Sequence, residues 1–251
     1  MTARIIQITD CHLRVDKSET FYGANPYRQL QQILKEVSQR QNEVSAVIFT
    51  GDLVQDECWP AYQNFVDLLS KHHWQIPLFL IAGNHDDLNH LNKVKTLAGF
   101  QQQSYFDITN WRVLLFCSHA ENAGGSGSIS EAQLSKMLTE LDNKSSQHLL
   151  VALHHHIVKY GSFIDKYPLK NSDGFMHWIK HNQQVKGIIH GHVHDNRQGD
   201  FYGKPWFACP ASSVQFCHTA EKAPTVVAGY NELTLHPDGH IDAKNHWLRL
   251  I

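Results

Sequence analysis

The sequence has no marked excess of charge of either sign and no long apolar run. Its 251 residues include 22 Lys and Arg against 24 Asp and Glu, a formal net charge of −2. This balance gives no global electrostatic reason to expect a nucleic-acid partner. No segment approaches the roughly 20 apolar residues of a membrane span, and no apolar segment typical of a signal peptide follows the start. We therefore expect neither a nucleic-acid nor a membrane partner.

The cysteines form no recognisable pattern. They are scattered, odd in number and without a Cys-x-x-Cys pair, at Cys11, Cys58, Cys117, Cys209 and Cys217. This usage is typical of free thiols in a reducing compartment and not of a disulfide framework. Together with the missing leader it predicts a cytoplasmic protein. Neither an internal repeat nor a low-complexity segment divides the chain, so we expect a single domain over residues 1–251.

Apolar strands and amphipathic helices alternate through most of the chain, which predicts parallel strands covered by helices and an α/β fold. Strands are expected at 4–9, 45–50, 76–82, 149–153 and 185–189, with a hairpin at 103–108 and 111–118. Helices are expected at 27–40, from 59 onward, at 89–98, from the capping box Ser130 to Gln133, and at 173–181. Residues 124–128 are expected to form a flexible loop. Beyond residue 201 three or four strands follow, and this terminal meander indicates a second, mixed sheet.

Histidine is unusually abundant, with 19 copies, and five predicted strands end in side chains that commonly bind metals. These are Asp10 with His12, Asp52, Asn84 with His85, the run His154–His156, and His192 with His194. Each group alone is typical of an ordinary polar turn. Their recurrence at five strand ends favours a common site, because ligands bind at the carboxyl ends of strands in open α/β sheets. On an extended backbone the side chains at i and i+2 point the same way, so each Asp-x-His or His-x-His pair can face one ion.

The mixture of ligands indicates the kind of site. Carboxylates, imidazoles and one amide favour manganese, iron or zinc ions and argue against a structural thiolate zinc site. Some eight ligands are too many for one ion, whereas two ions about 3.5–4 Å apart that share a carboxylate would use them. Such a pair is suited to phosphoester hydrolysis, in which a bridging water loses a proton and attacks phosphorus.

The ordered motifs resemble those of a known family. The set Asp10-x-His12, Gly51-Asp52-x-x-x-Asp56, Gly83–Asp86, a strand-end histidine and Gly191–His194 is similar to that of the calcineurin-like metallophosphoesterases. A narrower resemblance, to the bacterial class III 3′,5′-cyclic-AMP phosphodiesterases, covers nearly the whole chain. It rests on the segments 9–13, 23–25, 153–156, 161–165, 210–216 and 235–239. The resemblance implies a four-layer αββα sandwich of two mixed β-sheets flanked by helices.

The resemblance also implies roles for individual residues. One metal would be held by Asp10, His12, Asp52 and His194, and the other by Asp52, Asn84, His155 and His192, with Asp52 as the bridge. His85 would be a catalytic residue beside the phosphate and not a ligand, protonating the leaving oxygen or stabilising the transition state. His12, Asn84, His85 and His194 would also contact the substrate. The family usually has proline after its strand-end histidine motif, and here Ile157 stands there. His154 therefore remains an alternative to His155, which the alignment favours.

Several weaker signals stay open between function and packing. Phe21 and Tyr22 would stack on an adenine or simply pack, and His119 would line the phosphate site. Ser212, Ser213 and Gln215 are expected to have a structural or a substrate-lining role. Asp56 and Asp86 are expected to orient ligands without binding metal. Cys11 is expected to be a buried free thiol that points away from the metal ligands.

The sequence therefore predicts a di-metal phosphodiesterase that hydrolyses 3′,5′-cyclic AMP to 5′-AMP by attack of a metal-bridging hydroxide. The cofactors would be two divalent metal ions, Fe²⁺/Fe³⁺, Mn²⁺ or Zn²⁺, and the partner a small-molecule substrate. The alternative is a broader phosphodiesterase acting on 2′,3′-cyclic nucleotides, glycerophosphodiesters or other diesters. A metal-free scaffold that binds a protein partner is a third possibility. Such a scaffold would have lost ligands, and this chain keeps all of them. The oligomeric state is not predicted.

Overall fold

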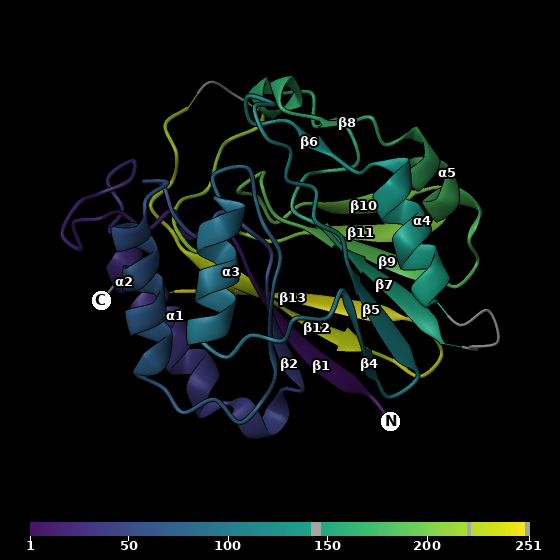
Figure 1. Cartoon of the computed structure of the whole chain (residues 1–251), viewed down its shortest axis with the longest axis horizontal. Coiled ribbons are helices and arrows are strands. Elements are labelled where there is room, and N and C mark those ends of the chain that lie inside the picture. The colour runs from purple at the N-terminus through teal and green to yellow at the C-terminus, as the bar shows by residue number, and fades with distance from the viewer. Residues whose placement is uncertain (142–146, 220–221, 249–251) are drawn as a thin grey trace.

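The computed structural model describes residues 1–141, 147–219 and 222–248. Two mixed β-sheets pack face to face, and helices cover the outer face of each sheet (Figure 1). The predicted four-layer sandwich is confirmed.

The first sheet has five strands, of which three neighbouring ones, from the centre to one edge, are parallel. Its order is β13(Ile241–Trp247), β12(Gly229–Leu235), β1(Ala3–Ile8), β2(Ala46–Phe49) and β3(Leu78–Leu80). Strands β1, β2 and β3 are parallel, whereas β12 runs antiparallel to both β1 and β13. The outer face is covered by α1(Pro26–Gln39), α2(Trp59–Ser70) and α3(Leu88–Leu97), which lie on the left in Figure 1. The carboxyl ends of the three parallel strands therefore meet at one edge.

The second sheet repeats this plan with different connections. Its order is β10(Gln198–Phe201), β11(Lys204–Ala208), β9(Val185–His190), β7(His148–Ala152), β5(Trp111–Leu115) and β4(Tyr105–Ile108). The four inner strands are parallel and the two edge strands are antiparallel to their neighbours. The outer face is covered by α4(Glu131–Glu140) and α5(Asp173–His181). Ser130 caps α4 by accepting a hydrogen bond from the Gln133 N–H at 3.2 Å, so the predicted helix start is confirmed.

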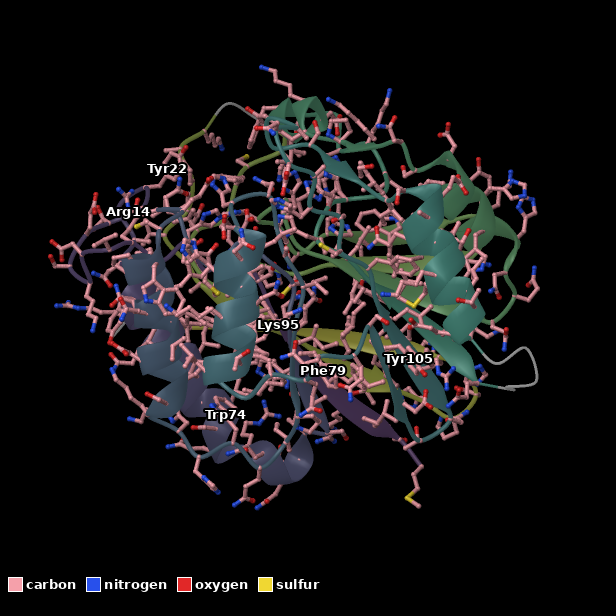
Figure 2. All side chains as sticks on the ribbon, viewed as in Figure 1. Arg14, Tyr22, Trp74, Phe79, Lys95 and Tyr105 are labelled. Atoms are coloured by element: carbon pink, nitrogen blue, oxygen red, sulfur yellow. The ribbon has the colours of Figure 1, made fainter. Side chains whose placement is uncertain are left out.

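Three apolar layers hold the sandwich together. One lies between the first sheet and its helices and includes Leu30 and Phe65, and another lies under α4 and α5. The third lies between the sheets, where Phe79 of β3 (labelled in Figure 2) stacks on Phe106 of β4 with ring centroids 3.9 Å apart. The two sheets therefore share one core.

The terminal strands differ from the expectation of one meander. Strands β10 and β11 extend the second sheet beside β9, whereas β12 and β13 extend the first sheet beside β1. Alternating polarity identifies strands but not their neighbours, so the sequence did not show that the chain crosses from the second sheet to the first between β11 and β12.

A small third sheet was also missed. Part of the segment expected to be a flexible loop forms β6(Gly127–Ser128), which pairs in parallel with β8(Leu169–Lys170). A two-residue strand is too short to show a periodic pattern. Two 3₁₀ turns, η1(Gln41–Glu43) and η2(Phe163–Lys166), complete the elements named for the described segments. Within those segments, no helix has both the length and the apolar character to span a membrane.

Candidate metal centre

The predicted ligands come together where the carboxyl ends of the parallel strands of both sheets meet. Backbone hydrogen bonds join the loops after the strands: the Asp10 N–H donates to the Gly51 carbonyl at 3.0 Å, and the Gly191 N–H donates to the His154 carbonyl at 3.1 Å. The two sheets are linked directly, because the His192 N–H donates to the Asp10 carboxylate at 2.9 Å. Asp10 and His192, which are 182 positions apart in the sequence, therefore share one buried site.

The loop backbone is not extended at the ligands. Five candidate ligands have positive φ angles: Asp10 (52°), His12 (47°), Asp52 (52°), His192 (71°) and His194 (49°). Residues other than glycine rarely adopt this left-handed backbone region, and each one that does so costs about 1–3 kcal/mol of folding free energy. The expectation that Asp10 and His12 converge through an extended i, i+2 pair was therefore wrong in its geometry. The side chains converge because each loop makes a left-handed turn after its strand.

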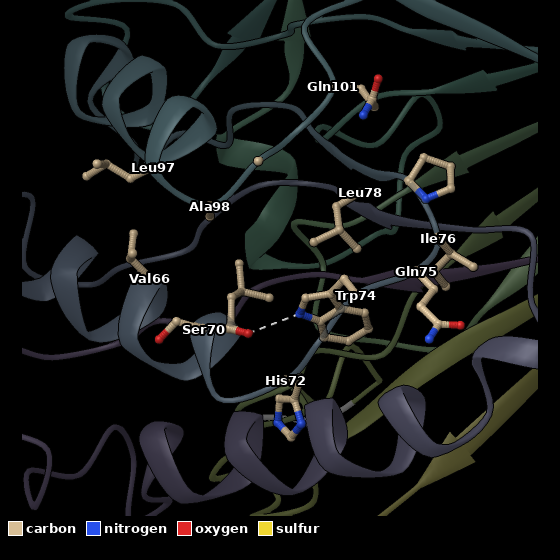
Figure 3. Close-up of a pocket in the computed structure, with 13 residues that line it drawn as sticks. Val66, Ser70, His72, Trp74, Gln75, Ile76, Leu78, Leu97, Ala98 and Gln101 are labelled. Carbon is tan, nitrogen blue, oxygen red and sulfur yellow. Dashed lines mark hydrogen bonds between the residues drawn. The ribbon is translucent and has the colours of Figure 1, made fainter.

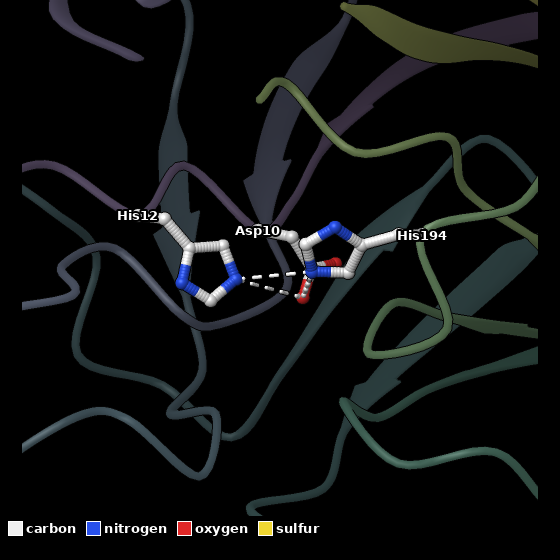
Figure 4. A group of neighbouring side chains, drawn as sticks. All are labelled: Asp10, His12 and His194. Carbon is white, nitrogen blue, oxygen red and sulfur yellow. Dashed lines mark hydrogen bonds and ion pairs between the residues drawn. The ribbon is translucent and has the colours of Figure 1, made fainter. Parts of the chain in front are cut away.

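A first cluster consists of Asp10, His12 and His194 (Figure 4). The two imidazole Nε2 atoms lie 3.0 Å apart, and the Asp10 Oδ1 lies 3.4 Å from the Nε2 of His194 and 3.9 Å from that of His12. All three side chains are buried. The inner face of the cluster is therefore made of ligand atoms that point at one another.

The other nitrogen of each ring fixes its tautomer. Nδ1 of His12 donates to the Gln55 side-chain oxygen at 3.0 Å, and Nδ1 of His194 donates to the Val214 carbonyl at 2.8 Å. A neutral ring that donates through Nδ1 carries a lone pair on Nε2. Burial, followed by the proximity of His194, lowers the pKa of His12 to about 3, so this ring is neutral.

These contacts test whether the cluster suits a cation. Lone pairs on these two Nε2 atoms, 3.0 Å apart, would repel each other unless a proton or a metal ion lies between them. Oδ1 of Asp10 is buried and has no hydrogen-bond partner, an arrangement that normally costs about 1–3 kcal/mol or more for a charged group. A divalent ion satisfies both requirements, because imidazole and carboxylate are ordinary ligands of such ions. The residues therefore fit a metal site.

A second cluster lies beside the first. Asp52, His154 and His192 form a group of candidate ligand atoms. Nε2 of His154 lies 3.5 Å from the Asp52 Oδ2 and 3.1 Å from the Asn84 side-chain oxygen. The same Asp52 oxygen lies 3.8 Å from Nε2 of His12 in the first cluster. Asp52 is thus placed between the two clusters, where a shared carboxylate is expected.

The structure distinguishes the two candidate histidines of the strand-end run. His154 donates through Nδ1 to the Thr50 carbonyl at 2.7 Å, which leaves Nε2 directed at Asp52 and Asn84. Both nitrogens of His155 are occupied, Nδ1 by the Ser118 hydroxyl at 2.8 Å and Nε2 by the Gly125 carbonyl at 3.1 Å. The sequence prediction favoured His155, but the geometry favours the alternative, His154.

At the second cluster, the charges of Asp52 and His154 stabilise each other. Burial alone would raise the pKa of Asp52, but the nearby His154 charge and hydrogen bond outweigh it and hold this pKa well below its usual range. Burial opposes protonation of His154, yet the Asp52 carboxylate raises the pKa of that ring to about 9. A proton on His154 therefore balances the carboxylate when no metal is bound, and a bound cation would replace that proton.

Residues behind the ligands hold the loops in place. Asp86 accepts hydrogen bonds from the N–H groups of Asp52 (2.8 Å), Leu53 (3.1 Å) and Gly83 (2.9 Å). A side chain at Gly83 would collide with Asp52, so this position requires glycine. Asp86 therefore has the orienting role predicted for it. Asp56 does not, because its carboxylate pairs with Arg14 at 3.0 Å and has no ligand as a partner.

The weaker candidates divide between the cavity and its support. Ser212 and Ser213 donate to the carbonyls of Thr9 (3.0 Å) and Asp10 (2.8 Å), so their role is structural. Gln215 likewise bonds only backbone groups. Nδ1 of His119 donates a hydrogen bond to the Gly83 carbonyl at 2.8 Å. Cys11 is buried in the apolar core with a free thiol, as predicted.

A cavity of about 530 Å³ opens over the two clusters. His85 lies in it, with a side chain that is one-third exposed and a ring centroid 5.2 Å from that of His12. The backbone N–H of His85 donates to the Asp52 carboxylate at 2.8 Å. Phe21 stacks on His12 at 4.6 Å, and Phe216 stacks on His194 at 4.2 Å. Sequence reasoning considered Phe21 but gave Phe216 no role, because its position depends on the crossing segment between the sheets.

A second hollow of about 530 Å³ lies between α2, β3 and α3 (Figure 3). Its wall includes Trp74, whose ring nitrogen donates to the Leu69 carbonyl at 3.1 Å. None of the metal-ligand clusters found among the described residues borders it. Volume alone therefore does not identify a site.

Sequence reasoning also missed the partners that orient the histidine rings. Gln55 orients His12, whereas the carbonyls of Val214, Thr50 and Tyr167 accept from His194, His154 and His192. Three of these four partners are backbone carbonyls, which have no sequence signature. Gln55 lies inside the Gly-Asp-x-x-x-Asp motif and was the only one that a closer reading of the sequence would have found.

The fold and the paired ligand clusters define a class of metal-dependent phosphoesterase. A family model described as calcineurin-like phosphoesterase matches residues 3–196. The chain belongs to this family, and the resemblance seen in its motifs is confirmed.

The chain is also similar to curated bacterial proteins over nearly its full length. It is 32% identical to a probable cyclic nucleotide phosphodiesterase of Colwellia psychrerythraea, covering 95% of this chain and 92% of that protein. It is 31% identical to the 3′,5′-cyclic adenosine monophosphate phosphodiesterase CpdA of Haemophilus influenzae, covering 95% and 87%. It is 30% identical to the CpdA of Escherichia coli K12, covering 98% and 90%.

Solved structures of more distant proteins share the fold. The purple acid phosphatase PPD1 of yellow lupin superposes with a TM-score of 0.60 at 15% identity, over 93% of this chain and 49% of that one. GAP50 of Plasmodium superposes with a TM-score of 0.60 at 13% identity, over 97% and 84%. At these identities the likeness concerns the fold alone.

Proposed function

We propose that this protein is a di-metal phosphodiesterase that hydrolyses 3′,5′-cyclic AMP to 5′-AMP. The observation that carries the proposal is the pair of neighbouring buried ligand clusters with Asp52 between them. The chain is also similar over nearly its whole length to proteins named for this activity. The cleaved bond is that between phosphorus and the 3′-oxygen, and water supplies the new oxygen on phosphorus.

We propose that Asp10, His12, Asp52 and His194 hold one divalent ion and that Asp52, Asn84, His154 and His192 hold the other, with His154 in place of His155. Their ligand types suit Fe²⁺/Fe³⁺, Mn²⁺ or Zn²⁺. When bound, such ions neutralise charge on the phosphate oxygens and activate a water as nucleophile. The carbonyls and Gln55 behind the rings keep each ligand lone pair pointing inward.

His85 would act on the substrate directly. It lies in the cavity, and none of the contacts among the described residues satisfies its ring fully: Nδ1 is 3.8 Å from the Glu57 carboxylate. A partly exposed imidazole beside the clusters is suited to donate a proton to the leaving 3′-oxygen. His12, Asn84 and His194 also border the cavity and would contact the phosphate.

The alternative is a phosphodiesterase of broader specificity, acting on 2′,3′-cyclic nucleotides or glycerophosphodiesters. The cavity of about 530 Å³ has room for more than a phosphate group and two metal ions, so it would admit such substrates. We favour the cyclic nucleotide because the curated relatives carry that name. We also propose a cytoplasmic location, which the five free cysteines support.

The test compares substrates and one variant. On protein reconstituted with Mn²⁺, kcat/KM for 3′,5′-cyclic AMP should exceed that for 2′,3′-cyclic AMP and for bis(p-nitrophenyl) phosphate. Asp52→Asn removes one charge of the shared carboxylate and should abolish turnover of all three. Turnover of only the generic diesters would support the broader enzyme, and full activity of the Asp52→Asn protein would refute the site.

A further inference from the structure

We infer that Tyr22, Phe163 and Phe216 form a stacking site for the base of a nucleotide, beside the cluster that contains His12 and His194. This deepens the proposed function and rests on it, because it assigns the part of the substrate that the metal ligands do not contact. The three rings come from three segments far apart in the sequence. Phe163 and Phe216 lie in the segments 161–165 and 210–216, which belong to the resemblance, and neither ring is itself a candidate metal ligand.

Phe216 is the fixed centre of this group. Its ring stacks on the His194 ring with an angle of 19° between planes, and its N–H donates to the His194 carbonyl at 2.9 Å. Tyr22 and Phe163 meet Phe216 edge to face, with centroids 6.0 and 5.4 Å away. Both angles are near perpendicular, 89° and 79°. The two rings therefore stand upright beside Phe216.

The outer rings are anchored although they are exposed. Phe163 stacks on His218 at 5.6 Å, and His218 donates to the Val193 carbonyl at 2.7 Å, between the ligands His192 and His194. Tyr22 is held at the tip of a turn closed by two hydrogen bonds between Phe21 and Ala24, of 2.8 and 3.0 Å. The structure thus positions the rings relative to the metal ligands.

The exposure of these rings indicates a ligand. Tyr22 is 60% exposed and Phe163 is 44% exposed, among the most exposed large apolar side chains of the described residues. Tyr22 lies at the rim of the molecule in Figure 2. Anchored aromatic faces left open beside a catalytic site are suited to stack on a flat ring.

The cavity continues past these rings. Tyr22, Phe163 and Phe216 border both the cavity over the metal clusters and a neighbouring hollow of about 480 Å³. A base attached to a phosphate at the clusters would therefore have space on either side of the rings. The neighbouring hollow also has Lys222 and Thr219 on its wall. Stacking is tolerant of base identity, because every base has a π-face, so the site would select for a nucleoside and not for adenine alone.

The test measures binding and not turnover. Isothermal titration calorimetry on Mn²⁺-loaded protein would compare 5′-AMP with ribose 5-phosphate, which has the same phosphate and sugar but no base. Stacking on one base predicts that 5′-AMP binds about 5- to 150-fold more tightly. Tyr22→Ala and Phe163→Ala should each reduce this ratio, and Phe163→Leu should reduce it too, because leucine keeps apolar volume but has no π-face.

Tyr202→Ala is the matched control. Tyr202 is also exposed, at 62%, and shares the left-handed backbone of Tyr22, with φ 52° against 47°. This variant should keep the wild-type ratio. A wild-type ratio near one, an unchanged ratio in the Phe163 variants, or an equal loss in Tyr202→Ala would each overturn the inference. A preserved ratio without hydrolysis of cyclic AMP would instead refute the proposed function and leave the base site standing.

Discussion

Replacing His154 and His155 one at a time tests the assignment of the second metal site. The two residues are adjacent and fully buried, yet their nitrogens have different partners. His154→Ala removes the ring whose Nε2 lies 3.5 Å from Asp52 and 3.1 Å from Asn84. His155→Ala removes a ring held by Ser118 and Gly125. We expect only the first change to remove a metal ligand.

The expected magnitudes follow from these contacts. Losing a residue that merely orients a ligand typically lowers metal affinity 10- to 100-fold, so losing the ligand itself should lower it by more than about 100-fold. Both substitutions also leave a buried hydrogen-bonding group without its partner, which costs about 1–3 kcal/mol. In a chain of this size that corresponds to a fall in Tm of about 2–12 °C. Stability therefore does not separate the two variants, but metal content does.

The assay is metal content per chain after gel filtration, measured by inductively coupled plasma mass spectrometry, together with kcat/KM for cyclic AMP. His154→Ala should retain about one ion per chain and lose nearly all activity. His155→Ala should retain both ions and substantial activity at a temperature well below its Tm. The opposite result, with one ion in His155→Ala and two in His154→Ala, would refute the assignment and restore His155 as the ligand.

Two further predictions concern residues away from the shared carboxylate. Gln55→Leu removes the hydrogen-bond acceptor of His12 Nδ1. It should lower the affinity of the metal site that contains His12 by about 10- to 100-fold, as measured by competition with a chelator. An unchanged affinity would show that Gln55 does not orient the ring. Glu232 is paired with Arg40 at 2.7 Å and Arg4 at 3.9 Å, and although burial opposes it, the Arg40 interaction lowers the pKa of this carboxyl below the usual 4.5. Its stabilisation is therefore fully present above about pH 4.5 and is lost as the pH falls through the lowered pKa. Urea unfolding should find Glu232→Gln less stable than wild type by about 1–3 kcal/mol at pH 7 and closer to it near pH 3; a difference independent of pH would contradict this account.

The helices and strands could be predicted because they depend on local patterns. The start of α4 follows from Ser130 and the polarity after it, and α5 was predicted with the bounds that the structure has, Asp173–His181. Short elements such as β6 could not be predicted, because two residues are too few to show a periodic pattern of apolar side chains. The pairing of strands could not be predicted either, because nothing in the local sequence shows that β11 and β12 belong to different sheets.

The sequence by itself determined which residues have the chemistry for a metal centre. Carboxylate, imidazole and amide side chains at strand ends are visible in order and spacing, and parallel strands bring their ends to one edge. The tertiary structure alone decided which nitrogen of each histidine faces inward, because three of the orienting partners are backbone carbonyls of distant segments. It is likewise only the tertiary structure that favours His154 over His155, through the position of the His154 ring beside Asp52 and Asn84. Adjacent residues in a loop point in directions set by the backbone turn and by their hydrogen-bond partners, and neither is written in the local sequence.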